Sequence, residues 1–174
     1  MSSNKPQFVH LHVHSEYSML DGLCGIPELV QKVKDLGQSA VAITDHGGMY
    51  GALHLYNNCL KAGIKPIVGL EAYVAKKSHL DKQVRPGGDQ SHLTLLSTNH
   101  NGYKNLLKLT SIANLEGFSY KPRIDLDLLT KHSQDLILLT GCPQSQMNQF
   151  LRNGQDEEAE KILQKDIKLI IKHS

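Results

Sequence analysis

Short apolar runs rich in β-branched residues alternate along this chain with longer segments of helical periodicity, and this alternation constrains the fold most strongly. Helices are expected at residues 26–36, 52–62, 103–114, 125–132, 144–151 and 157–173, and strands at 8–15, 40–44, 67–75, 93–97 and 136–140. Gly69 is expected to divide the 67–75 strand into two short pieces. Because strands that alternate with helices usually run parallel, we expect an α/β fold, either an open doubly wound sheet or a barrel.

The composition describes one globular domain and leaves the binding partner open. The chain has 174 residues, of which 40% are hydrophobic and 21% charged, enough for a sizeable core. A net charge of +2 gives no basic stripe of the kind that marks many nucleic-acid-binding domains. Three cysteines without CxxC spacing argue against a disulfide framework, and no stretch approaches the roughly 18 apolar residues of a membrane span. We therefore expect a cytoplasmic protein with reduced thiols and no membrane partner.

The segment FVHLHVHS, residues 8–15, carries three histidines at alternating positions. In an extended strand His10, His12 and His14 project from one face, while the apolar residues between them face a core. Neutral imidazole is the commonest metal ligand, so this row suggests zinc, manganese or iron. A chance cluster is the alternative, since the chain has ten histidines. A second signature, residues 44–46 (TDH), follows another apolar run and favours the metal site.

Polar residues of ligand type lie near the ends of several expected strands. In barrel enzymes, groups from several strand ends converge on one mouth and build the site there. A distorted barrel therefore fits better than an open sheet. His92 does not fit this pattern, because it stands at a strand start. The residues concerned are His12, His14, Asp45, His46, Glu71, His92 and Cys142.

Six motifs occur in an order that resembles the PHP (polymerase and histidinol phosphatase) superfamily: HLHVHS, SMLDG, AITDHG, GIKPIVGLEAYVA, HLTLLS and LTGC. More narrowly, the chain is similar to the amino-terminal domain of the bacterial replicative DNA polymerase III alpha subunits of family C. The resemblance spans about residues 8 to 150 and includes KPRID at 121–125. It implies a distorted (β/α)7 barrel whose mouth holds up to three divalent metal ions.

The resemblance also implies roles for individual residues. His12 and His14 would bind a first metal, Glu71 would bridge it to a second completed by His92 and Cys142, and Asp21 and His46 would hold a third. His12, His14 and Glu71 would act in catalysis through metal-bound water, and His10 and Asp45 would orient the ligands. Five other histidines carry no such signature and are expected to be exposed or locally bonded: His54, His79, His100, His132 and His173.

Chemistry supports this set independently of the resemblance. A carboxylate can bridge two cations about 3.5 to 4 Å apart, and a thiolate beside an imidazole favours zinc over magnesium. Taken singly, each residue has a simpler explanation: Cys142 as a buried apolar thiol, Asp21 as part of a turn, and Glu71 as a surface carboxylate. The metals left open are zinc, manganese, iron and magnesium.

The family's last two ligands, an Asp and a His two residues apart, have no counterpart before Ser174. We therefore expect residues 1–7 to be a tail and 8–174 the amino-terminal portion of a PHP domain, truncated before its last ligand motif. Alone, this piece is expected to be inactive or impaired.

The resemblance implies a metal-dependent phosphoesterase attached to a DNA-directed DNA polymerase, with 3′–5′ exonuclease proofreading in the intact protein. The implied partners are DNA at a primer 3′ end, the rest of the polymerase chain and replisome subunits. The substrate stays open between a primer terminus, a nucleotide and pyrophosphate. One alternative is a free-standing phosphatase of the histidinol-phosphatase type, which the polymerase-like residues 18–23 and 64–74 disfavour. The other is a scaffold domain without catalysis.

Overall fold

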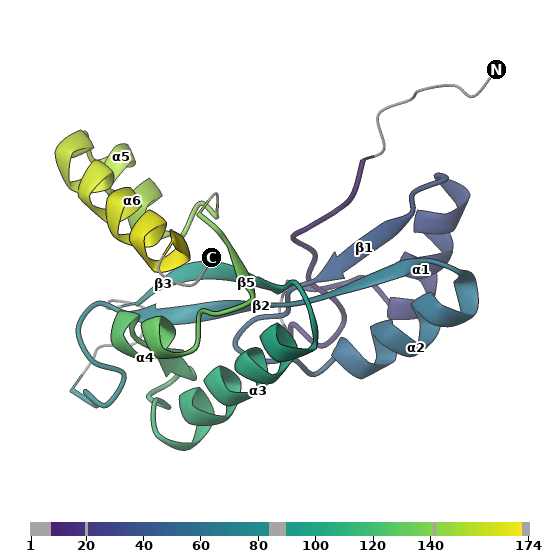
Figure 1. Ribbon diagram of the computed structural model, residues 1–174, viewed down its shortest axis with the longest axis horizontal. Helices are drawn as coiled ribbons and strands as arrows, with labels where there is room; N and C mark the ends of the chain where they lie inside the picture. The colour runs from purple at the N-terminus through teal and green to yellow at the C-terminus, as the bar shows by residue number, and fades with distance from the viewer. Residues whose placement is uncertain (1–7, 20, 84–89, 141, 172–174) are drawn as a thin grey trace.

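The computed structural model describes residues 8–19, 21–83, 90–140 and 142–171, so the expected tail at residues 1–7 and His173 lie outside the described residues. A mixed sheet has the strand order β1-β2-β3-β5 (Figure 1), and β4 pairs with β2 off this path. The mixed α/β class is thereby confirmed. The described strands form an open sheet, and the barrel stays a prediction. The strands are β1 (Ala40–Ile43), β2 (Lys65–Ala75), β3 (Gln90–Ser97), β4 (Arg123–Ile124) and β5 (Leu136–Leu139).

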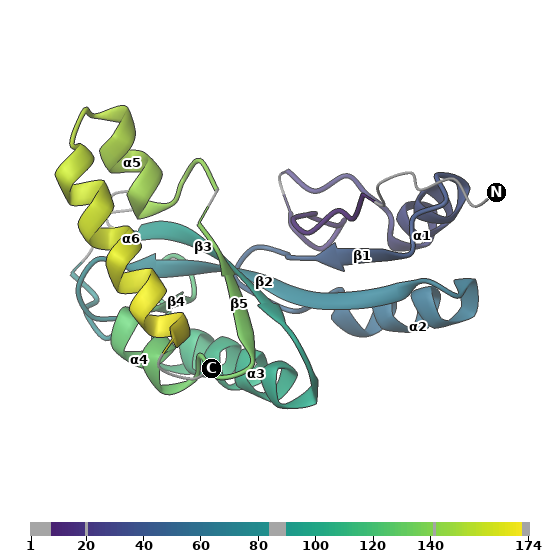
Figure 2. The same ribbon diagram turned by 45° about the horizontal axis from the view of Figure 1, so that its top comes forward.

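All six expected helices form, and two clusters of buried apolar side chains hold the first four of them to the sheet. The smaller core joins α1 and α2 to β1, and the larger joins α3 and α4 to β2, β3 and β5. Helices α5 and α6 lie side by side, and α6 contacts β5 (Figure 2). In the described residues, no helix is long and apolar enough to cross a membrane. The helices are α1 (Ile26–Asp35), α2 (Ala52–Ala62), α3 (His100–Leu115), α4 (Leu126–Lys131), α5 (Gln146–Arg152) and α6 (Asp156–Ile171).

The expectation that all strands run parallel is wrong for β3. Strand β2 pairs in parallel with β1 and β4, but β3 pairs antiparallel with both β2 and β5. Strand β3 therefore runs against the other four. A parallel neighbour needs a crossover connection, usually a helix, and no helix lies in the described part of the connection between β2 and β3. The reversal also explains why a residue at a strand start can join residues at strand ends. The start of β3 pairs with the end of β2, and His92 lies opposite Tyr73.

The histidine-rich segment is not a regular strand, which corrects the expectation for residues 8–15. It runs beside β1 through two backbone hydrogen bonds of 2.8 Å, from Ala42 N–H to the His10 carbonyl and from Thr44 N–H to the Val13 carbonyl. Leu11, expected to face a core, is 39% exposed. Two hydrogen bonds are too few to pair this segment with β1 as a regular strand. No described element packs over Leu11 closely enough to bury it. The alternation of side chains therefore correctly brings His12 and His14 together, but it does not bury Leu11 between them.

Strand β2 continues through Gly69, where two separate pieces were expected. A Cβ atom at Gly69 would lie 2.7 Å from the Leu95 carbonyl oxygen and 2.8 Å from the Thr44 methyl carbon. Glycine is therefore needed for close approach of neighbouring segments, not for a break in the strand. The short strand β4 was not expected at all, since two residues carry no readable alternation.

Candidate metal centre

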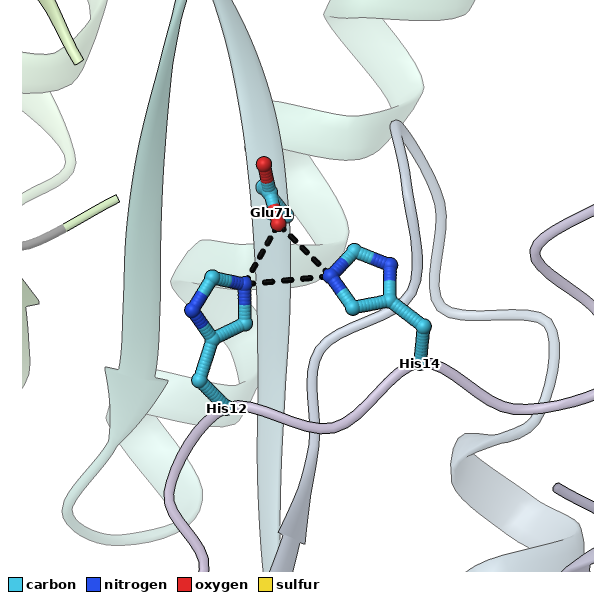
Figure 3. A group of neighbouring side chains, drawn as sticks. All are labelled: His12, His14 and Glu71. Atoms are coloured by element: carbon cyan, nitrogen blue, oxygen red, sulfur yellow. Dashed lines mark hydrogen bonds and ion pairs between the residues drawn. The ribbon is translucent and has the colours of Figure 1, made fainter. Parts of the chain in front are cut away.

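Glu71 lies in the buried half of β2, and its side chain is only 2% exposed. A buried carboxylate is costly unless several donors or cations surround it. Its Oε2 lies 2.5 Å from His12 Nε2 and 2.8 Å from His14 Nε2. The two ring nitrogens are themselves 3.1 Å apart, so three ligand atoms converge on one point (Figure 3).

The second oxygen of Glu71 faces a different set of donors. His92 Nδ1 contacts Oε1, the Cys142 Sγ lies 3.4 Å from it, and His46 Nδ1 lies at 3.8 Å. His92 enters from the reversed strand β3, and Cys142 follows β5. The two carboxylate oxygens thus serve two donor sets that come from different segments.

A third group forms around His46, which follows β1. Its Nε2 lies 2.7 Å from Asp21 Oδ2, and its ring centroid is 4.0 Å from that of His14. Three groups therefore have ligand atoms within 4.8 Å of one another: His12 with His14 and Glu71, His14 with Asp21 and His46, and His46 with Glu71 and His92.

The charge state of this cluster is dominated by Glu71. Burial raises the pKa of its carboxyl, but hydrogen bonds from His12, His14 and His92 outweigh burial and hold the pKa far below its usual range. The hydrogen bond to Glu71 raises the pKa of His14, against the opposing effect of burial. Burial raises the pKa of the Cys142 thiol to about 11, so a thiolate there requires a nearby cation.

The donor chemistry fits a divalent metal. Contacts of His12 and His14 with one oxygen require a proton on each facing nitrogen, whereas a cation would satisfy all three lone pairs together. The Nδ1 atoms of His14 and His46 are also buried without a hydrogen-bond partner in the described structure. Imidazole, carboxylate and thiolate donors in this combination suit zinc.

Residues 10–174 match the PHP domain family. This chain belongs to the PHP domain family. Over 141 residues it is 53% identical to the DNA polymerase III subunit alpha of Borreliella burgdorferi, covering 80% of this chain and 12% of that protein. The corresponding protein of Treponema pallidum is 48% identical over 88% of this chain and 13% of its own length. That of Thermus aquaticus is 42% identical over 95% of this chain and 14% of its own length.

This PHP chain spans less than one seventh of the length of those curated relatives. Among solved structures, an amidohydrolase from Chromobacterium violaceum aligns with a TM-score of 0.45 and 21% sequence identity. The alignment covers 60% of this chain and 32% of that one.

Asp45 ties the histidine segment of the PHP chain to the end of β1. Its buried carboxylate accepts hydrogen bonds from the Ser15 backbone N–H at 2.7 Å and from the Ser18 hydroxyl at 2.8 Å. The Ser18 oxygen in turn accepts from the His46 N–H at 3.1 Å. Asp45 is therefore placed to orient His14 and His46 through their backbones, and not by touching their rings.

The ring contact of His10 is with Phe8, edge-on at a centroid distance of 4.7 Å. A supporting role for His10 at the metal centre stays a prediction.

Sequence reasoning missed Ser15 and Ser18, whose hydroxyls hold Asp45. Ser15 is the last residue of the HLHVHS motif and Ser18 is the first of SMLDG, and small hydroxyl residues at such positions can form local hydrogen bonds.

The expectation that His79 is exposed or only locally bonded is wrong. Its side chain is 13% exposed, and its Nδ1 lies 2.5 Å from the Asp125 carboxylate, 46 positions away. The sequence contains no spacing that could join these two residues. His100, by contrast, is exposed as expected.

Proposed function

We propose that this chain is the amino-terminal PHP domain of a bacterial replicative DNA polymerase and that its Glu71 cluster holds divalent metal ions. The observation that carries the proposal is the arrangement at Glu71, whose two buried oxygens meet different donor sets. Such a carboxylate can bridge two cations about 3.5 to 4 Å apart, the separation used in two-metal phosphoryl transfer. The relatives named DNA polymerase III subunit alpha support the identity of the parent protein.

Zinc and manganese are the ions we propose first, with iron and magnesium as the other candidates. The described sheet would be the first part of a distorted (β/α)7 barrel, and the last two ligands would come from the parent chain beyond residue 174. Three donor sets would hold the ions: His12 with His14 and Glu71, Glu71 with His92 and Cys142, and Asp21 with His46.

The proposed reaction is hydrolysis of the last phosphodiester at a primer 3′ end, that is, 3′–5′ exonuclease proofreading in the cytoplasm. Divalent cations held there would acidify water and stabilise the charge that develops on the leaving oxygen. His12, His14 and Glu71 would hold the reacting groups in place, and Asp45 would keep His14 in register. Tyr73 packs edge-on against the ring of His92 at this centre. The remaining polymerase chain and replisome subunits would be the protein partners.

The test is a nuclease assay of the full-length protein with a labelled single-stranded DNA and added zinc or manganese, in the absence of nucleotides and pyrophosphate. His14→Ala removes a donor shared by two of the three groups. We expect 3′ digestion to fall on the order of 100-fold or more, since loss of a residue that only supports a ligand costs 10- to 100-fold.

His100→Ala is the matched control, because His100 is an exposed histidine on α3. It should digest DNA at the wild-type rate, and both variants should still extend primers. Equal digestion by wild type and His14→Ala would contradict the proposed function. A full-length protein that binds no zinc or manganese would support the scaffold alternative instead.

A further inference from the structure

The metal centre opens into a cavity of about 760 Å³ whose wall is unusually aromatic for this chain. Phenylalanine and tyrosine make up only 5% of the residues, and tryptophan is absent. Five of these few rings nevertheless line this one cavity, together with the Glu71 cluster: Tyr17, Tyr50, Tyr73, Phe118 and Tyr120.

Four of the five rings are exposed, so they do not serve the core. Tyr17 is 42% exposed, Tyr50 61%, Phe118 53% and Tyr120 65%. They come from three separate parts of the chain: the segment after His14, the residues before α2, and the connection between α3 and β4. Exposed apolar surface gathered from distant segments at the edge of a cavity is typical of a binding site.

Tyr120 stands at the tip of a tight turn. The Ser119 N–H donates to the Lys121 carbonyl at 3.0 Å, and Tyr120 itself has a φ of 59°, in the left-handed region that favours glycine. The Tyr120 side chain is 65% exposed, so it contributes little to the packing of the core. Strained residues of this kind cluster at ligand-binding sites.

A positive charge accompanies the rings. The Lys121 ammonium lies 5.4 Å from the centroid of the Tyr73 ring and is the only lysine or arginine among the described residues that line the cavity. Tyr73 in turn packs edge-on against His92, at a centroid distance of 5.0 Å. Lys121 and His92 thus both contact Tyr73, and all three line the cavity that holds Glu71.

We propose that Tyr50, Tyr120 and their aromatic neighbours form a stacking platform for the bases of a single-stranded nucleic-acid end, with Lys121 on the adjoining phosphate. Flat rings beside a cation match a base and its phosphate, since every base has a face that stacks on an aromatic side chain. This inference rests on the proposed function, because the metal centre would cleave what the platform positions. The platform would favour substrates that carry a base over pyrophosphate and over phosphate esters that carry no base.

The test compares two single-stranded DNAs that differ only at the 3′ end: one carries normal terminal nucleotides, and the other carries terminal nucleotides without bases. With the full-length protein, Tyr120→Ala should raise KM for the normal end by about 5- to 100-fold, the worth of one stacked base. Tyr120→Phe keeps the ring and should behave as wild type. Neither substitution should change KM for the base-free end.

Tyr56→Ala is the matched control, because Tyr56 is a 46% exposed tyrosine that lines a different cavity. It should leave both substrates unaffected. If Tyr120→Ala weakens digestion of both ends equally, or if wild type does not prefer the normal end, the platform is overturned while the nuclease proposal stands.

A second measurement does not depend on digestion. A single strand with 5-iodouracil as its 3′ base is photo-cross-linked to the full-length protein, and the adduct is mapped by mass spectrometry. Adducts on Tyr50 or Tyr120 would support the platform even if no cleavage occurs and the nuclease proposal fails. Absence of adducts from the rings lining this cavity would overturn the platform.

Discussion

Two buried carboxylates in this protein each meet histidine, but their surroundings differ. Asp125 accepts a hydrogen bond from the Leu128 N–H at 2.8 Å on one oxygen, and from both the N–H and the ring of His79 on the other. Glu71 is contacted by imidazoles and a thiol, and in the described structure no backbone N–H donates to its side chain.

The difference separates a structural carboxylate from one of ligand type. Asp125 caps the start of α4 and fixes the residues after β2, where the buried Arg123 also binds the carbonyls of His79 and Asp81. Backbone donors satisfy it permanently, so it needs no ion. Glu71 depends on side chains from separate segments that face a cavity, and those contacts can be exchanged for contacts with cations. A histidine beside a buried carboxylate therefore indicates a metal site only where backbone N–H groups do not already satisfy that carboxylate.

The largest effect should follow removal of the structural carboxylate. Asp125→Ala deletes a helix cap and leaves a largely buried imidazole without its partner, so the opening free energy of α4 should fall by about 2–3 kcal/mol. Amide hydrogen exchange of α4 in the full-length protein measures this directly. Zinc content should stay at the wild-type level, and a loss of zinc would break the distinction between the two carboxylates.

The two buried thiols, Cys142 and Cys59, allow the same comparison between a ligand-type and a structural side chain. Burial raises the pKa of both Cys142 and Cys59 to about 11. Only Cys142 lies beside Glu71, whereas Cys59 lies on the buried face of α2, in the smaller apolar core. Cys142→Ser should weaken zinc binding by roughly 10- to 100-fold and affect manganese less, because thiolate favours zinc. Competition with a chromogenic chelator measures both affinities. Cys59→Ser should change neither, and equal losses in the two variants would show that the effect is structural.

Asp45 should have a smaller influence, because it would act on the proposed ligands only through neighbouring backbone and serine groups. Asp45→Asn keeps the shape but weakens the hydrogen bonds from Ser15 and Ser18, and we expect zinc affinity to fall by about 10-fold. The same chelator competition applies. An unchanged affinity would mean that the histidine segment holds its position without Asp45.

The smallest effect concerns pH. Burial raises the pKa of Asp125, but its hydrogen bonds with His79 and Leu128 outweigh burial and leave the pKa below the ordinary value of about 4. The stabilisation is therefore complete above that ordinary value and is lost as the pH falls through the lowered pKa. The opening free energy of α4 should decline in this acid range in wild type and decline less in Asp125→Asn. Parallel curves for the two proteins would contradict this assignment.

Local signals in the sequence predict all six helices of the described structure. The bounds of α2 agree at both ends, and its C-terminal end is set by Gly63, which adopts a left-handed conformation. The positions of His12, His14, His46 and Glu71 in or after expected strands also predict residues that the fold brings together. The direction of β3 could not be predicted from the strand pattern, since direction depends on the connection and not on the strand's own residues.

Contacts between distant polar residues escape prediction for a similar reason. The bond between His79 and Asp125 joins positions 46 apart, and nothing in either local sequence specifies the other. The platform residues Tyr50 and Tyr120 are equally ordinary in sequence and become notable only when the fold places them on one cavity. Only three-dimensional packing distinguishes these residues from surface side chains.

The central claim is that Glu71 organises a metal centre, and the most direct measurement is the metal content of the full-length protein. After chelation and reconstitution with zinc, mass spectrometry of the elements gives ions per chain for wild type, Glu71→Gln and the matched Asp125→Asn. We predict at least one zinc ion fewer per chain in Glu71→Gln and no loss in Asp125→Asn, because two of the three donor groups contain Glu71. Equal zinc content in wild type and Glu71→Gln would contradict the account.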